Sequence, residues 1–189
     1  MFRLFISVDV KDQLILKAIE AATKEVNQLK SVRLTDSSQL HFTLKFLGDT
    51  PEDKVPVINN ALSAIRWTNF SLTLQGLGVF PKPSFPRVVW VGVSSGKQLI
   101  KDLAQKVDKA LIKKEFPREK RPFSPHLTVG RFKSKKFSSE LLLQIINNFQ
   151  DTEFGQLSVQ EINLKKSTLT PQGPIYETLS SFPASSKED

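Results

Sequence analysis

The sequence contains no cysteine among its 189 residues. This absence excludes disulfide bonds, thiolate metal sites and a cysteine nucleophile. Long apolar runs are also missing, and no stretch approaches the roughly 20 residues that a membrane-spanning helix needs. The opening MFRLFISVDV meets Asp9, Lys11 and Asp12 too soon for the apolar core of a signal peptide. Together these absences predict a cytoplasmic protein.

Histidine is nearly as scarce as cysteine, because the chain has only two. His41 lies in QLHFTLKFLG at 39–48, and His126 lies in SPHLTVGRF at 124–132. Both begin the same pattern of histidine, apolar residue, threonine and apolar residue. A single histidine on a sheet is more often a surface or hydrogen-bonded residue than a catalyst. A given histidine meets this pattern by chance roughly once in a hundred, however, so finding it at both favours a functional role.

Acidic residues are outnumbered by basic ones, 19 to 27, which gives a net charge of +8. A basic surface attracts anions, and nucleic acid is the commonest polyanion. Solubility alone is the alternative explanation of such a charge. The charge therefore favours nucleic acid as a partner without requiring it.

The hydrophobic patterns predict an α+β fold in one domain, residues 1–189, with mostly antiparallel sheet and outer helices. Strands are expected at 2–10, 39–47, 70–80, 87–93, 126–132, within 154–170, and at 174–180. Helices are expected at 11–30, from about 51 to 65, at 97–115 and at 138–150. Each half of the chain has a long helix, a loop, a histidine strand, a shorter helix and further strands. This order suggests a duplication, with the second half beginning at about residue 97.

The two histidine strands present a defined chemistry. Side chains alternate along a strand, so His41 and Thr43 share one face, as do His126 and Thr128. Two imidazoles are too few for a structural zinc site, and the chain has no HExxH, G-x-S-x-G or P-loop motif. Paired general acid and base catalysis remains, because histidine serves both roles near neutral pH. Displacement at a phosphodiester with threonine hydroxyls beside the charged oxygens suits this arrangement.

HFTL and PHLTVGR together resemble the signature of the two-histidine phosphoesterase superfamily. The likeness is greatest to its RNA 2′,3′-cyclic phosphodiesterase branch, historically called 2′-5′ RNA ligase. It extends over RLFISVDV, LHFTLKFLGDT, GVFPKPSFPRVVWVGV and GPIYETL. The resemblance implies two pseudo-symmetric lobes around a central cleft that holds both histidines. It also implies hydrolysis of RNA 2′,3′-cyclic phosphate ends to 2′-phosphates with no metal or other cofactor.

The resemblance further implies a role for each residue of the motifs. His41 would be the proton donor to the departing 3′-oxygen, and His126 the acceptor that activates water. Thr43, Thr128 and Arg131 would bind the phosphate. Strict alternation places Arg131 on the core side of its strand, so it reaches the cleft only if the strand ends or bulges at Gly130.

Further candidates and other functions remain open. Lys45 shares the predicted face of His41, while Phe42, Leu44 and Phe46 are expected in the core. Weaker candidates for contacts with RNA are the aromatic residues near proline loops and the basic runs, namely Phe80, Phe85, Phe123, KKEFPREKR at 113–121 and KSKK at 133–136. The alternative functions are a phosphodiesterase or reversible ligase acting on 2′-5′ linked oligonucleotides or small cyclic phosphates, and a non-catalytic nucleotide-binding module. The expected partners are RNA ends or small cyclic phosphates. A monomer is expected.

Overall fold

The computed structural model describes residues 1–189 except 115, 120–121, 172 and 186–189. Within the described residues the strands are β1 Phe2–Asp9, β2 Val32–Leu34, β3 His41–Thr50, β4 Phe70–Phe80, β5 Val88–Ser95, β6 Leu127–Phe132, β7 Glu153–Val159, β8 Glu161–Thr170 and β9 Gly173–Pro183. The helices are α1 Gln13–Asn27, α2 Val55–Ser63, α3 Lys97–Ile112 and α4 Ser139–Asn148, with short 3-10 turns η1 Ser37–Gln39 and η2 Glu52–Lys54.

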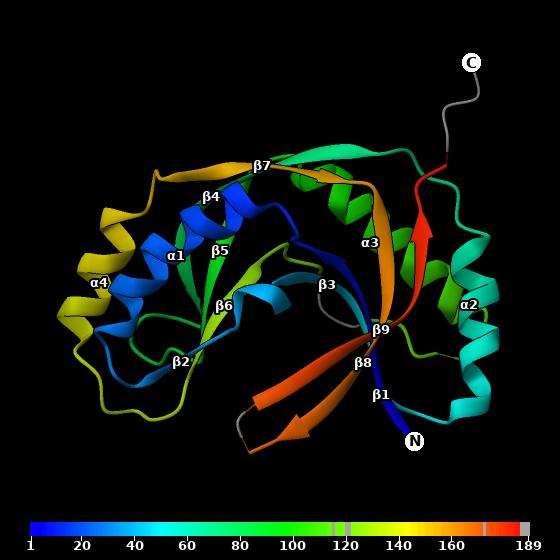
Figure 1. Cartoon of the computed structure of the whole chain (residues 1–189), viewed down its shortest axis with the longest axis horizontal. Helices are drawn as coiled ribbons and strands as arrows, with labels where there is room; N and C mark the ends of the chain where they lie inside the picture. The colour runs from blue at the N-terminus through cyan, green and yellow to red at the C-terminus, as the bar shows by residue number, and fades with distance from the viewer. Residues whose placement is uncertain (115, 120–121, 172, 186–189) are drawn as a thin grey trace.

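The strands form one curled sheet in the order β7-β4-β5-β6-β3-β1-β8-β9, with β2 paired to β6 off this path. Neighbouring strands pair antiparallel throughout. Figure 1 shows the helices outside the sheet, with α1 and α4 on one side of the molecule and α2 and α3 on the other. The predicted α+β class, with antiparallel sheet and outer helices, is confirmed.

The helices cover the sheet through apolar stripes. In α1 the buried residues recur at helical spacing, from Ile15 and Ile19 to Ala22 and Val26. Asp12 caps this helix, because its carboxylate accepts hydrogen bonds from the backbone amides of residues 14 and 15. Among the described residues, no helix has both the length and the apolar character needed to cross a membrane.

The two sides of the sheet meet at the histidine strands. β3 and β6 share a ladder of one pair, Phe42 opposite Leu127, and both side chains are fully buried. Beyond this pair β6 continues beside β2 instead, with Val32 opposite Phe132. The sheet therefore divides next to the two motifs. Each side of the sheet takes strands from both halves of the sequence. One side combines β1 and β3 with β8 and β9, and the other combines β4 and β5 with β6 and β7. The division of the chain into two halves near residue 97 stays a prediction.

Two differences from the sequence-based expectations concern short elements. Residues 154–170 form two strands, because pairing breaks at residue 160 and β7 and β8 lie at different places in the sheet. The three-residue strand β2 was not expected, because a strand of that length has too few side chains to show a period.

The structure places Lys45 on the opposite face of β3 from the one predicted. The expected alternation fails after Thr43, because Ile6 pairs with Lys45 while Ser7 pairs with Thr43, which leaves Leu44 as an extra residue in β3. Lys45 therefore faces inward at 3% exposure, and Phe46, expected in the core, is 64% exposed. The Lys45 ammonium donates to the Asp108 carboxylate on α3 at 2.5 Å and to the Pro117 carbonyl at 2.7 Å. Lys45 thus ties β3 to α3 and takes no part in the cleft.

Removing the partner of this buried ammonium should destabilise the protein. We expect Asp108→Ala to lower the free energy of unfolding by about 3 kcal/mol, because an uncompensated charge is left inside. Urea unfolding measures this loss. Asp102→Ala is the matched control on the same helix, where an exposed carboxylate meets only the Gln98 amide, and its effect should stay within about 0.5 kcal/mol. Equal effects of the two substitutions would contradict this assignment of Lys45.

Candidate active site

The histidines and threonines of both motifs meet on one face of the sheet. Phe42 and Leu127 point into the core as a cross-strand pair. His41 and Thr43 flank Phe42, and His126 and Thr128 flank Leu127, so alternation places all four side chains on the face opposite to the buried pair. The two motifs thus form one cluster of two imidazoles and two hydroxyls.

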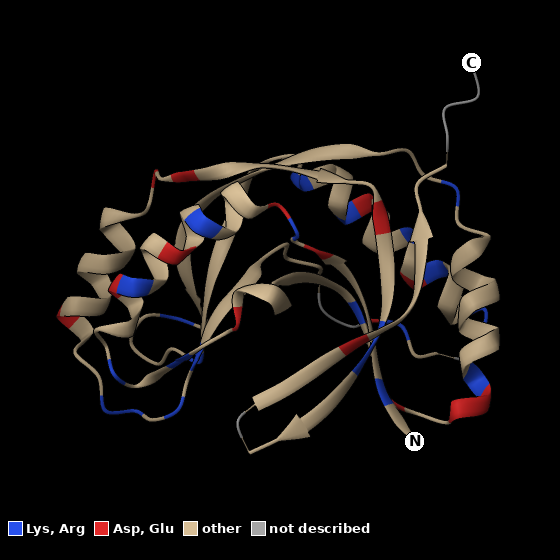
Figure 2. Ribbon diagram, in the orientation of Figure 1, with Lys and Arg blue, Asp and Glu red and all other residues tan. Residues whose placement is uncertain are grey.

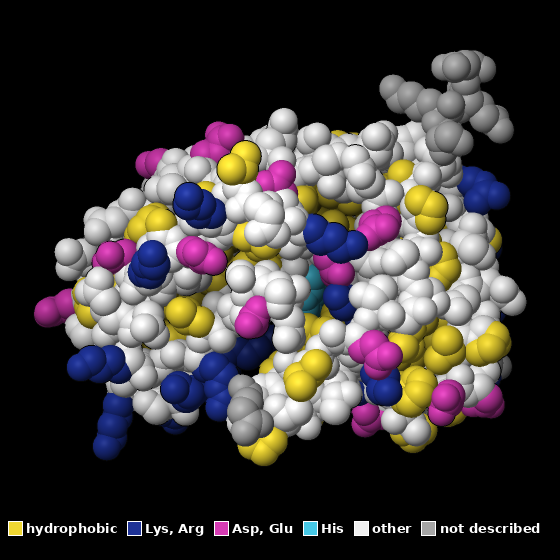
Figure 3. All heavy atoms as spheres, viewed as in Figure 1, with side chains coloured by type: hydrophobic (Ala, Val, Ile, Leu, Met, Phe, Trp, Pro, Cys, Tyr) yellow, Lys and Arg dark blue, Asp and Glu magenta, His cyan; other side chains and the backbone are white. Residues whose placement is uncertain are grey.

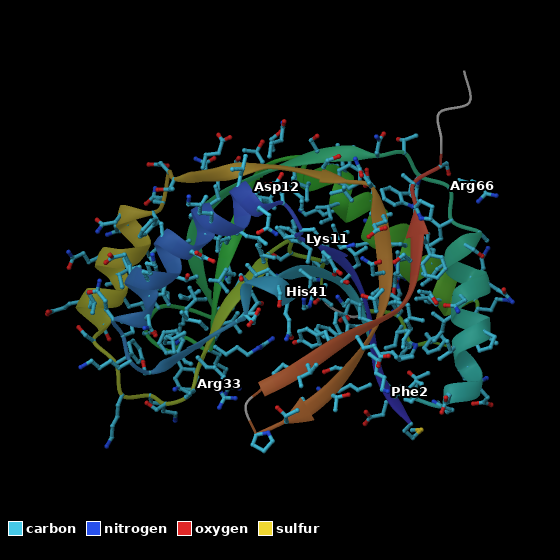
Figure 4. All side chains as sticks on the ribbon, in the orientation of Figure 1. Phe2, Lys11, Asp12, Arg33, His41 and Arg66 are labelled. Carbon is cyan, nitrogen blue, oxygen red and sulfur yellow. The ribbon has the colours of Figure 1, made fainter. Side chains whose placement is uncertain are left out.

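This cluster lies at the bottom of a hollow. Figure 3 shows a histidine ring at the base of a depression between the two sides of the molecule, and Figure 4 places His41 at the centre of the same view. All four side chains of the cluster are partly exposed. A small anion can therefore reach both imidazoles from solvent.

The orientation of each imidazole is fixed by its own chain. The Nδ1 atom of His41 lies 2.7 Å from the Gln39 carbonyl, and that of His126 lies 2.7 Å from the Ser124 carbonyl. A carbonyl oxygen only accepts, so each Nδ1 carries the hydrogen and donates. The neutral ring then has a free lone pair on Nε2. Each Nε2 is able to accept a proton, or to donate one when the ring is charged.

Aromatic rings hold both imidazoles from the side. Tyr176 meets His41 edge to face with ring centroids 5.0 Å apart, and Phe80 meets His126 in the same geometry at 5.0 Å. Phe5 lies 4.9 Å from His41 at an interplanar angle of 33°. Phe80 therefore serves as a wall of the site, and its half-buried ring also packs on Trp90.

Arg131 lies on the same face as His126. Trp90 pairs with Thr128 and Val89 with Gly130, so β6 carries one extra residue, Val129, at this point. Val88 then pairs with Arg131. Trp90 and Val88 share a face of β5, and their partners therefore share a face as well. The bulge expected as a condition for Arg131 to reach the cleft is present, one residue earlier than Gly130.

The reach of the Arg131 charge agrees with this placement. Burial lowers the pKa of His41 and of His126, and the Arg131 guanidinium adds to this effect. Burial raises the pKa of Tyr176, and the same guanidinium opposes that rise. These rings come from β3, from the start of β6 and from β9. The Arg131 cation thus acts on both sides of the cleft. A guanidinium in this position is able to bind an anion held between the two histidines.

Sequence reasoning missed two residues of this face. Phe46 pairs with Phe5, whose ring contacts His41, and its own ring is largely exposed. It follows His41 by five residues, as Arg131 follows His126 by five, and each strand bulges in between. Arg33 on β2 pairs with Arg131. No pattern in the sequence marks Arg33, whereas the repeated spacing could have identified Phe46.

Electrostatics distinguish the two histidines. Burial is the main influence on both, and it lowers each pKa from 6.5, while the carbonyl acceptor on Nδ1 opposes it. Asp9, directly opposite His41 on β1, also raises the pKa of His41, and Lys165 and Arg131 lower it. Arg131 is the only charged group acting on His126 among the described residues. The protonated form is therefore favoured at His41 by a carboxylate that His126 lacks.

Asp9 belongs to a buried polar network beside His41. Its two carboxylate oxygens accept hydrogen bonds from the Ser7 hydroxyl and from the Lys165 ammonium, each at 2.8 Å. Both Asp9 and Lys165 are about nine-tenths buried. The network fixes a negative charge near the imidazole without touching it.

The other predicted candidates lie apart from the cluster or outside the described residues. The run 113–121 includes residues 115, 120 and 121, which the structure does not describe. Phe123 is half-buried and packs against the core. Among the described residues, no three side chains of histidine, aspartate or glutamate come together as a metal site would require.

Acid sensitivity of the fold follows from the two lowered histidine pKa values. Below about pH 6.5 the unfolded histidines gain protons that the folded ones resist, so stability falls as the pH drops from 6.5 toward the folded pKa values. The double variant His41→Asn, His126→Asn should lose less unfolding free energy between pH 7.5 and pH 5 than the unsubstituted protein. Urea unfolding at several pH values measures both slopes, and equal slopes would contradict the burial effect.

Comparison with known proteins places this geometry in a family. The family model described as the 2′-5′ RNA ligase superfamily matches residues 13–168. An RNA 2′,3′-cyclic phosphodiesterase from Archaeoglobus fulgidus is 39% identical over 180 residues, which are 95% of this chain and 99% of the relative.

Solved structures agree with the fold. The structure of TT0787 from Thermus thermophilus superposes with a TM-score of 0.78 at 28% identity, over 96% of this chain and 97% of that one. E. coli LigT complexed with 3′-AMP gives a TM-score of 0.78 at 23% identity, over 97% of this chain and 98% of that one. On the strength of the family model and the curated relative, this chain is a member of the 2′-5′ RNA ligase superfamily.

Proposed function

We propose that this protein hydrolyses RNA 2′,3′-cyclic phosphate ends to 2′-phosphates by metal-independent acid and base catalysis. The observation that carries the proposal is the convergence of two imidazoles, each with Nδ1 bound and Nε2 free, beside Thr43, Thr128 and Arg131. The curated relative bears the name of this activity and aligns over nearly the whole chain.

The reaction balances with these groups. The neutral His126 Nε2 takes a proton from water, and the oxygen attacks phosphorus. The bond from phosphorus to the 3′-oxygen breaks, and protonated His41 donates its Nε2 proton to that oxygen. The product is a 3′-hydroxyl with a 2′-phosphate, and the two rings return to their starting states by proton exchange with solvent. Thr43, Thr128 and Arg131 stabilise the charge that develops on the non-bridging oxygens.

The acid role of His41 has support beyond the family resemblance. An acid must be protonated before the reaction, and a base must be neutral. Burial lowers the pKa of both imidazoles. Apart from the carbonyl acceptors on Nδ1, Asp9 is the one influence in the described residues that favours a protonated ring, and it acts at His41 against burial, Lys165 and Arg131. The buried carboxylate therefore favours the assignment of His41 as donor and His126 as acceptor. The monomeric state and the cytoplasmic location stay predictions.

Loss of either imidazole should abolish turnover. We expect His41→Ala and His126→Ala each to lower kcat on 2′,3′-cyclic AMP by about 100-fold or more, because one proton transfer is lost. EDTA should leave the rate of the unsubstituted protein unchanged. Phosphorus NMR identifies the product, and circular dichroism checks that the variants are folded. Full activity in both variants, or a 3′-phosphate product, would overturn the proposal.

Changes at the Asp9–Lys165 pair should move one limb of the pH–rate profile in opposite directions. The alkaline limb reports loss of the proton from the acid, His41. Asp9→Asn removes a charge that raises the His41 pKa, so the limb should move to lower pH. Lys165→Met removes a charge that lowers it, so the limb should move to higher pH.

The acid limb of the same profile is the internal control. It reports His126, for which neither Asp9 nor Lys165 contributes to the pKa, and it should stay in place in both variants. Measurement of kcat/KM on 2′,3′-cyclic AMP from pH 5 to pH 9 gives both limbs. Movement of the acid limb alone would reverse the roles of the two histidines.

A further inference from the structure

The net positive charge of the chain comes from three segments. Residues 30–35, 80–90 and 127–138 contain no acidic residue. Their eight basic residues are Lys30, Arg33, Lys82, Arg87, Arg131, Lys133, Lys135 and Lys136. The remainder of the chain has 19 basic and 19 acidic residues, so the net charge of +8 equals the charge of these segments. We call their exposed side chains the basic surface.

These segments, distant in sequence, are adjacent in the fold. Arg131 pairs with Arg33 on β2 and with Val88 on β5. The Phe132 amide donates to the Arg87 carbonyl at 3.0 Å, and the Lys133 amide donates to the Ser31 carbonyl at 2.8 Å. Figure 2 shows the corresponding basic positions together on the loops below α1 and α4, away from the acidic positions of the helices.

The charges of the basic surface are not neutralised within the chain. All eight side chains are exposed, and in the part of the chain that the structure describes none of them forms an ion pair. The Arg87 guanidinium and the Lys135 ammonium both lie against the Phe85 ring, at 5.3 Å and 5.1 Å from its centroid. The two cations repel each other because they lie against the same ring, and a bound anion would reduce this repulsion.

The basic surface begins in the candidate active site. Arg131 belongs to both, and Phe80, which packs on His126, is the first residue of the segment that leads to Arg87. A strand of RNA whose cyclic end lies between the histidines must leave the cleft. On the His126 side it meets this uncompensated positive charge, whereas the charges on the rest of the chain balance.

We propose that the basic surface binds the phosphodiester backbone of the nucleotides that precede the cyclic end, so that RNA strands are preferred to mononucleotides. This inference rests on the proposed function and specifies its substrate class. Lysine and arginine contacts to successive phosphates supply affinity without base specificity. The surface therefore selects for length and charge rather than for sequence.

The test compares two substrates with the same terminal nucleotide. One is 2′,3′-cyclic AMP, and the other is an eight-nucleotide RNA that ends in adenosine 2′,3′-cyclic phosphate. The test variant is Arg87→Ala, Lys133→Ala, Lys135→Ala. The matched control, Lys17→Ala, Lys97→Ala, Lys109→Ala, removes three exposed charges from α1 and α3. The measurement is kcat/KM for each substrate between 50 and 200 mM salt.

The test variant should lose at least about tenfold in kcat/KM on the RNA and remain unchanged on cyclic AMP. Three lost phosphate contacts should reduce the slope of log kcat/KM against log salt by about 2 on the RNA, at about 0.7 for each contact to a single strand. The control variant should keep most of both the rate and the slope.

Each other outcome has a distinct meaning. Equal losses on both substrates, or equal effects of the test and control variants, would overturn the basic surface as an RNA site and leave the proposed function intact. No hydrolysis of either substrate by the unsubstituted protein would instead overturn the proposed function. Another outcome is that the unsubstituted protein binds anionic lipid vesicles and not the RNA. If the test variant then lost vesicle binding, a membrane surface would replace RNA as the partner.

Discussion

A single cross-strand pair, Phe42 with Leu127, joins the two sides of the sheet and sets the relation of the two motifs. Both side chains are fully buried, so the pair is held by the apolar cores on either side. A slip of one residue at this point would turn every side chain of one motif to the opposite face. The candidate site therefore depends on the register of one pair more than on any contact among the two histidines and two threonines themselves.

The strand bulges give the cleft two unlike walls. After each His-x-Thr the chain gains one residue, Leu44 in β3 and Val129 in β6. The fifth residue after the histidine then turns to the cleft on both strands. On β3 that residue is Phe46, and on β6 it is Arg131. A nearly symmetric backbone thus places an aromatic ring on one side and a cation on the other.

Several features of the fold and site were predictable because their signals are local. Alternation around the histidines predicted that His41 shares a face with Thr43 and His126 with Thr128, and hydrophobic periodicity identified the helices and most strands. The same patterns predicted the mostly antiparallel sheet, and the family resemblance implied the two lobes around a central cleft. These features depend on residues within a few positions of one another, where the pattern of side chains reflects burial directly.

Other features depend on pairing between distant strands and were not accessible from local patterns. The inward turn of Lys45 follows from a bulge that only the pairing with β1 reveals. The influence of Asp9 on His41 joins residues 32 positions apart through a strand ladder. The link from Lys45 to Asp108 on α3 spans 63 positions. Strict alternation assumes a regular strand, and both functional strands are irregular next to their motifs.

The interleaved order of the sheet also bears on how the chain can be divided. A break between β5 and α3 would give an N-terminal fragment that holds β4 and β5 apart from β3 and β1, because β6 lies between them. The C-terminal fragment would hold β6, β7 and the β8–β9 hairpin, and neither β6 nor β7 pairs with the hairpin or with the other in the described sheet. Neither piece contains a continuous sheet, so each would lack the partners that cover its edges.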